Sequence, residues 1–331
     1  MNKNLAIIGA GNIAPFHIEA AKNAGFNVIS IAASKNSESA KILSLKYAIP
    51  NYFSNVSDLL IDNSFDCLSI MIPPSATEEI LSKVATINKP TIIEKPTALS
   101  SGFLDDFIDK KNIIVGFNRR FYKTISELYS ECSQRKGIYS FEVVESLNSN
   151  HNVYEAIQYA IMNNTIHMVD LVRFLIGDYE LKDFVFSKIN YMLRSRIYVK
   201  DNYIGELQIS FGSKKNTKIE FETKENNLLL KPLEVLQRFN AMKITEPNHN
   251  TPVRTYLPIW SDEGIKKQVI ETGSLKPGFA DQYVEFRGFC EKGIISKRMA
   301  TLEDVHSALY KCELLVNHYE SNLNTTNQTR F

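Results

Sequence analysis

The sequence lacks the features that define several large classes of protein. It has four cysteines in 331 residues, none of them in a C-x-x-C pair, so we expect neither a zinc site nor a disulfide framework. Its 38 basic and 37 acidic residues leave a formal charge of +1, which provides no cationic field for a nucleic acid or an anionic membrane surface. A small molecule is therefore the favoured partner.

Long apolar runs are also missing. The apolar run near the amino terminus is interrupted by Gly, Asn and Pro and lacks a cleavage site, which is typical of a strand and not of a signal peptide. No stretch approaches the roughly 20 apolar residues that a membrane span needs. We therefore expect a cytoplasmic protein.

A glycine-rich turn follows the first apolar run. The run is apolar without alternation, as in a strand covered on both faces. Gly9 allows a tight turn, Gly11 lets the backbone approach a pyrophosphate, and the next helix would offer its first N–H groups to phosphate. The turn predicts a dinucleotide site with contacts at Gly9, Gly11, Asn12 and Ile13. The alternative is an ordinary glycine-rich turn between a strand and a helix.

The end of the second expected strand, residues 27–33, bears on the choice of cofactor. A carboxylate about 20 residues beyond the glycines usually binds the ribose hydroxyls of NAD, but Ser34 and Lys35 stand at this point. A hydroxyl and a cation suit a 2′-phosphate, which favours NADP(H) over NAD(H). The alternative is that Lys35 is a solvated loop lysine.

Strands and helices alternate up to about residue 119. This rhythm predicts a Rossmann domain over 1–119, with a right-handed, doubly wound parallel sheet. Ligands bind at the carboxyl ends of the strands in such a sheet. The residues expected at this edge are Gly9, Ser34, Pro73, Lys95 and Asn118. Between the glycine turn and residue 119, helices are expected over 57–61, 77–85 and 101–108. Strands are expected over 67–72, 91–93 and 113–117.

From about residue 120 strands predominate. They predict an α+β domain over 120–331, built on a mostly antiparallel open sheet. Helices are expected over 163–175, 279–291 and 301–320, the last with Thr301 and Asp304 as its cap and able to pack back on the first domain. Residues 233–276 give no clear assignment. The expected strands are 138–145, 183–186, 191–198, 205–211, 217–223 and 227–230.

Lys95 is the first catalytic candidate. It follows the strand over 91–93, between Glu94 and Pro96, at the edge where a nicotinamide ring would lie. Its ammonium group can hydrogen-bond or protonate the oxygen of a carbonyl that receives hydride, and it would need a lowered pKa to act as a base. The alternative is a surface lysine paired with an acid.

The second candidate is a polar cluster made of Asn163, His167 and Asp170. These residues are four and three apart, so on an α-helix they share one face. His167 could relay a proton while Asp170 orients its ring. Metal binding is not expected, because no second histidine or cysteine stands at ligand spacing. The alternative is that Asn163 and Asp170 cap or solvate the helix and His167 is a partly buried histidine.

Together these motifs resemble the glucose-fructose oxidoreductase, inositol dehydrogenase and rhizopine-catabolism (Gfo/Idh/MocA) oxidoreductases. The resemblance implies an NAD(P) domain joined to an α+β domain whose open sheet makes the contacts of a homodimer or homotetramer. It also implies a sugar, cyclitol or nucleotide-linked sugar as substrate, with Lys95 and His167 facing the reacting carbon. The matching residues, in order, are Gly9–Ala14 with His17, Pro73-Pro74, Glu94-Lys95-Pro96, Gly116–Phe121, and His167 with Asp170.

The resemblance also assigns roles to further residues. Substrate contacts are expected at Asn163, Asp170, Arg120 and Tyr154, and the expected cofactor contacts beyond the glycine turn and Ser34-Lys35 are Pro73, Thr77, Glu94, Lys95 and Asn118.

Three positions depart from the family pattern. Asn163 stands where an aspartate is usual, and an amide cannot exchange the reaction proton at ordinary pH. Proton transfer then falls to Lys95, His167 or a tyrosine such as Tyr154 or Tyr159. Thr165 replaces a usual glycine, and Thr77 a common histidine.

The function expected from the resemblance is hydride transfer between C4 of a nicotinamide and a secondary alcohol or ketone of a sugar or nucleotide-sugar. Residues 275–279, together with Gln282, resemble the sequence of family members found in surface-polysaccharide pathways. Two alternatives stay open: a non-catalytic dinucleotide-binding sensor, because of Asn163, and a reductase of a non-sugar substrate.

Overall fold

The computed structural model describes residues 3–34, 37–147, 152–267 and 275–324. The chain forms two compact units. Unit 1 consists of Met1–Phe121 and Ile270–Glu313, and unit 2 of Tyr122–Val269 and Leu314–Phe331. Every helix within the described ranges is too short or too polar to cross a bilayer. The domain limits expected from the sequence, 1–119 and 120–331, stay a prediction.

Unit 1 is built on a seven-stranded sheet with the strand order β15-β6-β5-β4-β1-β2-β3. Within β1 to β6, every pair of strands that are neighbours in the sheet is parallel. Strand β15 runs antiparallel to its neighbour, β6. The order 3-2-1-4-5-6 is that of the Rossmann fold, so the predicted parallel sheet is confirmed. The strands are β1 Asn4–Ile8, β2 Asn27–Ala32, β3 Asn51–Phe53, β4 Cys67–Ile70, β5 Thr91–Ile93, β6 Ile113–Val115 and β15 Ala300–Thr301.

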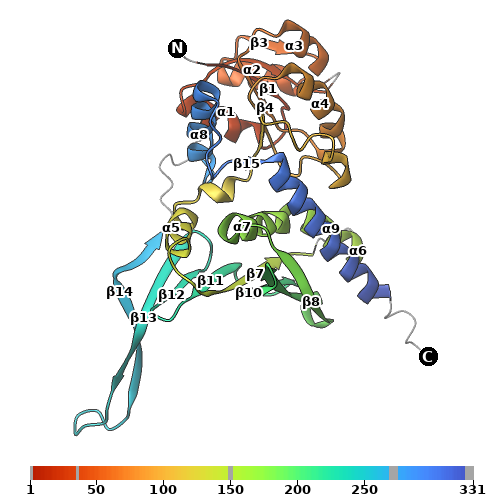
Figure 1. Ribbon diagram of the computed structural model, residues 1–331. Coiled ribbons are helices and arrows are strands. Elements are labelled where there is room, and N and C mark those ends of the chain that lie inside the picture. Colours follow the sequence, from red (N-terminus) through yellow and green to blue (C-terminus); the bar gives the residue numbers. More distant parts are fainter. Residues whose placement is uncertain (1–2, 35–36, 148–151, 268–274, 325–331) are drawn as a thin grey trace. The chain divides into compact units, whose positions relative to one another are not determined.

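Helices connect and cover these strands, as Figure 1 shows. They are α1 Ala14–Asn23, α2 Ser39–Tyr47, α3 Val56–Asp62, α4 Pro74–Ile87, the 3-10 helices η1 Gly102–Leu104 and η2 Asn118–Phe121, and α8 Phe279–Lys292. The final helix, α9 Leu302–Asn324, contributes residues to both units. The predicted cap of this helix is confirmed, because the N–H of Asp304 donates to the Thr301 hydroxyl and the N–H of Thr301 donates to the Asp304 carboxylate.

The helix expected over 101–108 is wrong. The backbone there makes only turns that close over three residues, as in the bond from the N–H of Leu104 to the carbonyl of Ser101. Gly102 is a poor helix former, and the Ser101 N–H and hydroxyl both donate to the Glu313 carboxylate. The segment is held by these side-chain contacts and does not continue as a helix.

Helix α8 joins unit 1 although it lies far along the chain. It packs beside α1 and closes an aromatic core, in which the ring centroids of Phe26 and Phe286 are 5.5 Å apart and those of Phe26 and Tyr283 are 6.2 Å apart. These rings are buried. Burying each such side chain contributes about 1.5–3 kcal/mol, so the aromatic face of α8 fixes the helix against the sheet.

Unit 2 is built on an eight-stranded sheet with the order β14-β13-β12-β11-β7-β10-β9-β8. Every neighbouring pair is antiparallel except β7 and β10, which confirms the mostly antiparallel sheet predicted from the sequence. The strands are β7 Ile138–Glu145, β8 Glu180–Ser187, β9 Met192–Val199, β10 Asn202–Phe211, β11 Lys218–Glu222, β12 Asn227–Leu230, β13 Val235–Thr245 and β14 Thr255–Lys267.

Helices cover one face of this sheet (Figure 1). The facing side chains are apolar, as the alternating burial of β9 and β11 indicates. The covering elements are α5 Lys123–Cys132, α6 Val153–Ala160, the π-helical turn η3 Ile161–Thr165 and α7 Ile166–Ile176, while the 3-10 turn η4 Ile189–Tyr191 precedes β9.

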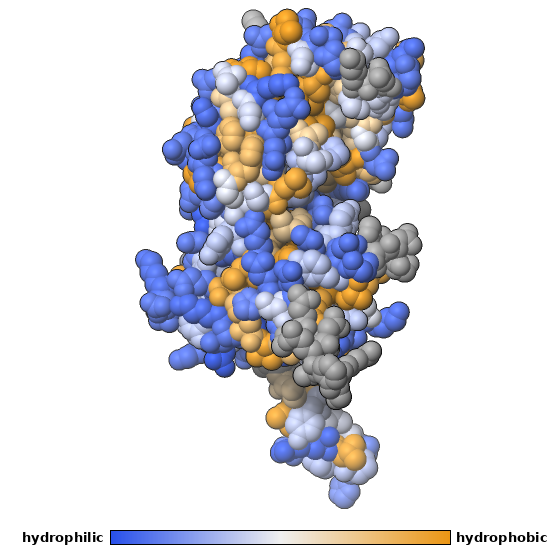
Figure 2. All heavy atoms as spheres, turned by 90° about the vertical axis from the view of Figure 1, so that its right-hand side faces the viewer, coloured by the Kyte–Doolittle hydropathy of each residue, from blue (hydrophilic) through white to orange (hydrophobic). Residues whose placement is uncertain are grey.

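The segment that the sequence left unassigned contains the β13–β14 hairpin, which extends beyond the rest of its sheet (Figure 1). Its apolar side chains are more than half exposed at Met242, Ile244, Tyr256 and Leu257. Figure 2 shows hydrophobic residues among hydrophilic ones on this projection. A strand whose apolar residues stay in solvent gives no clean inward and outward alternation, which explains why its sequence pattern was unclear.

Candidate functional site

The glycine turn lies at the carboxyl end of β1, between the ends of β2 and β4. Gly9 has a φ of +111°, and a Cβ on it would lie 2.2 Å from the carbonyl oxygen of Met71. Its N–H donates to the carbonyl of Ala32 at 2.8 Å. Only glycine can make this turn, because any other side chain would meet the β4 backbone.

Gly11 is in the opposite situation. A Cβ built on it meets no atom within 4 Å among the described residues. Helix α1 begins three residues later, and no side chain caps it. The N–H groups at Asn12 and Ile13 precede its first hydrogen-bonded turn, in which the N–H of Phe16 donates to the carbonyl of Ile13. Open backbone at a helix start fits the pyrophosphate of a dinucleotide.

The other predicted cofactor residues of unit 1 follow neighbouring parallel strands, so they share this edge of the sheet. Ser34 is exposed after β2, and Lys35 lies outside the described residues. Pro73 is the N-cap residue of α4, and the Thr77 hydroxyl donates to its carbonyl at 3.1 Å. The Asn118 amide donates to the carbonyl of Pro277 at 3.0 Å, which ties the end of β6 to the segment before α8.

Glu94, between β5 and Lys95, lies beside a buried chain of polar groups. Its carboxylate is 3.0 Å from Nε2 of His17, a side chain that is 1% exposed, but the two atoms are not aligned for a hydrogen bond. The Nδ1 atom of His17 lies 2.9 Å from the Tyr283 hydroxyl, which in turn lies 2.6 Å from the Ser69 hydroxyl. Burial raises the pKa of Tyr283 well above its usual range, so the phenol stays neutral. The chain joins α1, β4 and α8 to the residue before Lys95.

Gln282, on α8, adds an unsatisfied group at the same edge. Its side chain is 1% exposed, and neither atom of its amide has a hydrogen-bond partner among the described residues. A Cβ on Gly116, just after β6, would lie 3.5 Å from the Gln282 Nε2 and 3.0 Å from a Glu94 oxygen. Buried amides are normally satisfied, so this one indicates a polar ligand at the ends of β5 and β6. Together with the open backbone at Gly11, it fits a nicotinamide dinucleotide.

In unit 2 the predicted catalytic helix differs from expectation at its start. Asn163 lies in the π-helical turn η3, and its amide donates to the carbonyl of Tyr159 at 2.9 Å. The α-helical spacing assumed between Asn163 and His167 is therefore wrong, because a π turn is wider. His167 and Asp170 both belong to α7, where residues three apart share a face, and they are only 7% and 1% exposed.

Glu145, the last residue of β7, is a polar group at this turn that the sequence reasoning missed. Its two carboxylate oxygens accept from the Asn164 amide and the Thr165 hydroxyl, both at 2.7 Å, and the side chain is 6% exposed. Two adjacent residues of a regular α-helix diverge too far to bind one carboxylate easily, which gives the π turn its physical reason. The available signal was an acid at the end of the strand, directly after Val143 and Val144, together with Thr165 in place of glycine.

Two predicted substrate contacts are engaged within their own units. The Arg120 guanidinium is buried and lies 3.3 Å from the carboxylate of Asp304, which also caps α9. The Tyr154 hydroxyl donates to Glu320 at 3.3 Å, and burial together with this negative charge raises the pKa of Tyr154. Their roles in substrate binding stay predictions. No group of three or more metal-ligating side chains occurs within the described ranges.

Comparison with known proteins places the first unit in a sequence family. Residues 3–110 match the profile of a family described as oxidoreductases with an NAD-binding Rossmann fold. The chain is also 31% identical over 99 residues to glucose-fructose oxidoreductase domain-containing protein 2 of Xenopus laevis and of Xenopus tropicalis. These matches cover 30% of this chain and 26% of each relative, so the chain spans about a quarter of their length.

Solved structures share the fold over nearly the whole chain. A dehydrogenase (MviM) from Clostridium difficile matches with a TM-score of 0.72 and 17% identity, covering 96% of this chain and 100% of that one. Levoglucosan dehydrogenase, in complex with NADH and levoglucosan, matches at 0.72 and 17% over 97% and 98%. UDP-N-acetylglucosamine 3-dehydrogenase GnnA from Acidithiobacillus ferrooxidans matches at 0.71 and 16% over 95% and 96%. These likenesses establish a common two-unit fold.

Proposed function

We propose that this chain is an NAD(P)-dependent oxidoreductase of the Gfo/Idh/MocA family, whose profile matches residues 3–110. The reaction is transfer of a hydride between C4 of the nicotinamide and a secondary alcohol or ketone carbon of a sugar or nucleotide-sugar. The observation that carries this proposal is the pairing of an open glycine backbone at Gly11 with the orphaned, buried amide of Gln282 at one edge of the sheet.

The dinucleotide would supply or accept the hydride, and this chain's residues bind and orient it. Gly9, Gly11, Asn12 and Ile13 would hold the pyrophosphate at the start of α1. Pro73, Thr77, Glu94 and Asn118 follow strand ends of the same sheet and would contact the nicotinamide half, where the Gln282 amide also points to a polar ligand.

NADP(H) is proposed over NAD(H). This preference is supported by the exposed side chain of Ser34 after β2. In the sequence Lys35 follows Ser34, and no acidic residue stands at this strand end. The levoglucosan dehydrogenase structure contains NADH, which supports a nicotinamide cofactor in this fold without favouring the phosphorylated form.

Lys95 and His167 are proposed as the catalytic pair. The Lys95 ammonium would hydrogen-bond the oxygen of the reacting carbon, and His167 would hydrogen-bond or protonate the same oxygen. Asn163, Asp170, Arg120 and Tyr154 are proposed to contact the substrate. Holding cofactor and substrate at reacting distance can supply about 7 kcal/mol or more of the barrier reduction, so few catalytic groups are required.

The sugar or nucleotide-sugar substrate, and a role in surface-polysaccharide metabolism, are supported by the sequence resemblance and by two structural relatives. These relatives are named for levoglucosan and for UDP-N-acetylglucosamine. A second candidate function is dinucleotide binding without turnover. It is favoured by Asn163, because its amide donates to the carbonyl of Tyr159 and cannot transfer a proton.

A homodimer or homotetramer is proposed as the assembly. The exposed apolar side chains Met242, Ile244, Tyr256 and Leu257 of the β13–β14 hairpin support it, because exposed apolar patches mark interaction surfaces. Light scattering during size-exclusion chromatography tests this proposal. A monomer at every concentration would contradict it. The cytoplasmic location expected from the sequence stays a prediction.

The test of the proposed function is fluorescence titration with NADPH and NADH, followed by a screen of keto-sugars and nucleotide-sugars for cofactor oxidation. Tighter binding of NADPH, with turnover of a sugar, is the expected result. Binding without turnover of any sugar would favour the sensor, whereas turnover confined to an apolar ketone or an imine would replace the substrate class. Binding of neither cofactor would overturn the proposal.

A further inference from the structure

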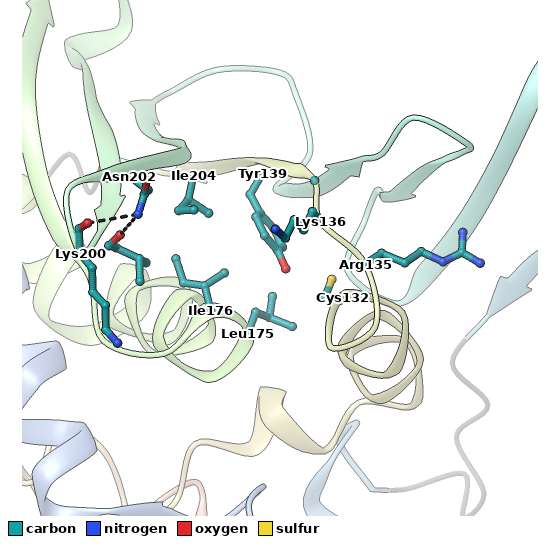
Figure 3. A pocket seen from close by; sticks show the side chains of 11 residues that line it. Cys132, Arg135, Lys136, Tyr139, Leu175, Ile176, Lys200, Asn202 and Ile204 are labelled. Carbon is teal, nitrogen blue, oxygen red and sulfur yellow. Dashed lines mark hydrogen bonds between the residues drawn. The ribbon is translucent and has the colours of Figure 1, made fainter.

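A cavity of about 590 Å³ lies within unit 2 (Figure 3). It is enclosed by the end of α5, the start of β7, the end of α7 and the turn between β9 and β10. Its size is within the range of about 300–1,000 Å³ that is usual for small-molecule sites. None of the residues proposed above for catalysis or cofactor binding lines it, so its ligand need not be the substrate.

The interior of the cavity is apolar. Figure 3 shows the side chains of Tyr139, Leu175, Ile176 and Ile204 directed toward a common space. The Tyr139 ring is fixed from behind, since its centroid lies 4.6 Å from that of Phe221. Such a lining favours a hydrocarbon body.

The polar groups of the interior are neutral and already engaged. The Tyr139 hydroxyl and the Cys132 thiol are hydrogen-bonded to each other, and burial raises the pKa of Cys132 to about 12 and that of Tyr139 above its usual range. The Asn202 amide donates to the carbonyl of Lys200 at 3.2 Å within the β9–β10 turn. Few groups are left to match the hydroxyls of a sugar, so a carbohydrate does not fit this cavity.

Two exposed lysines line the cavity. Neither Lys136 nor Lys200 has a carboxylate within ion-pair distance in the described part of the chain. Arg135 also lies there, but it pairs with Glu131 and Glu225 and is directed away from the cavity in Figure 3.

The acid nearest to each lysine in the sequence is engaged with another cation. Asp201 lies 3.4 Å from Lys182, and Glu131 lies 2.6 Å from Arg238 and 3.5 Å from Arg135. Two lysines without an ion-pair partner therefore line the same cavity as the apolar side chains. This arrangement repels cations and attracts anions.

From these observations we propose that the cavity binds an amphipathic carboxylate, with a short acyl or aryl body among the apolar side chains and the carboxylate bound by Lys136 or Lys200. Lys200 and Asp201 form the two-residue β9–β10 hairpin turn, with φ of 48° and 63°, and the Asn202 amide donates back to the carbonyl of Lys200. Ligand binding there is independent of the nicotinamide site.

The test is isothermal titration calorimetry of the full chain with octanoate and, separately, with 2-naphthoate. Octan-1-ol serves as the neutral counterpart of octanoate. We expect one of the two carboxylates to bind at one site per chain, and the comparison distinguishes an acyl from an aryl body. Octan-1-ol should bind at least about tenfold more weakly, because it lacks the charge that the lysines attract.

The matched variants are K136E/K200E and the control K214E/K224E, which reverses two exposed lysines outside the cavity. All four positions are on the surface, so both variants should fold and should bind NADPH as the wild type does. The first should weaken carboxylate binding at least about tenfold, and the control should change it less than about twofold.

Three results would overturn the proposal: no binding of either carboxylate to the wild type, equal binding of octan-1-ol, or equal loss in the two variants. Unchanged NADPH binding in all proteins separates these outcomes from a failure of the proposed oxidoreductase function.

Discussion

The Nε2 atom of His17 lies 3.0 Å from a carboxylate oxygen of Glu94, the residue that immediately precedes Lys95. His17 is on α1 and is almost fully buried. Its other ring nitrogen lies 2.9 Å from the Tyr283 hydroxyl, so the imidazole is anchored to α8. Its Nε2 side packs against the residue before the proposed catalytic lysine without an aligned hydrogen bond.

We predict that His17→Ala lowers kcat about 10- to 100-fold while the Kd for NADPH changes little. A displacement of about 1 Å at a reacting group can cost about 100-fold in rate, and the variant leaves the glycine turn intact. Steady-state kinetics and fluorescence titration measure the two quantities. Tyr283→Phe is the control, since it removes the contacts of the hydroxyl with His17 and Ser69 but keeps His17 beside Glu94, and it should cost less. Unchanged kcat in His17→Ala would show that the contact does not position Lys95.

The two glycines of the turn should behave differently. Gly9→Ala should lower the free energy of unfolding by about 3 kcal/mol or more, because the new Cβ would lie 2.2 Å from the Met71 carbonyl oxygen at a positive φ. Gly11→Ala should leave stability within about 0.5 kcal/mol, since its Cβ meets no described atom within 4 Å. It should nevertheless weaken NADPH binding at least about tenfold, by occupying the space for the pyrophosphate.

Urea unfolding and cofactor titration check this pair of predictions. If Gly11→Ala binds NADPH as well as the wild type does, the dinucleotide does not approach the backbone at this turn.

Arg120 can be tested as a structural or a substrate-binding residue. Its guanidinium is buried beside Asp304, and removing one partner of a buried ion pair usually costs about 3–5 kcal/mol. Arg120→Met and Asp304→Asn should therefore both lower the free energy of unfolding by several kcal/mol. If Arg120 also binds substrate, its variant alone should raise KM. A change in KM with wild-type stability would contradict the structural role of the pair.

Because the thiol of Cys132 is buried, we predict that the folded protein loses stability at alkaline pH. Burial raises its pKa from 9.0 to about 12 in the folded chain, so between these values the unfolded chain loses the proton first. The thiol's contribution is complete below about pH 9 and decreases by up to about 1.4 kcal/mol per pH unit above it. Urea unfolding from about pH 8 to about pH 11 should show a shallower decline for Cys132→Ala than for the wild type. Parallel declines would show that this thiol does not ionise differently on unfolding.

Local pattern was sufficient to predict the architecture of the parallel sheet. The apolar run before Gly9 and the repeated strand-helix rhythm are properties of neighbouring residues, and β5 Thr91–Ile93 and β12 Asn227–Leu230 have the predicted limits. The capping residues of α9 were also predictable, because Thr301 and Asp304 are three residues apart and bond each other directly.

The structural features that could not be predicted from the sequence depend on contacts between residues far apart in the chain. The π turn at Asn163 accompanies bonds from Asn164 and Thr165 to Glu145, which is about 20 positions earlier. No α-helical periodicity contains that information. The contact of His17 with Glu94 and Tyr283 joins three remote segments. The histidine was therefore predictable as a family match, but its partners were not.

The central claim, that Lys95 serves hydride transfer at a nicotinamide site, is tested most directly by comparing Lys95→Met with the wild type in a single-turnover reaction of bound NADPH with the sugar found in the screen. We predict that the variant binds NADPH within about threefold of the wild-type Kd and loses at least about 100-fold in the rate of NADPH oxidation. Equal rates in the two proteins would contradict the assignment of Lys95. Joint loss of cofactor binding and of oxidation would show that Lys95 supports the site without taking part in the chemistry.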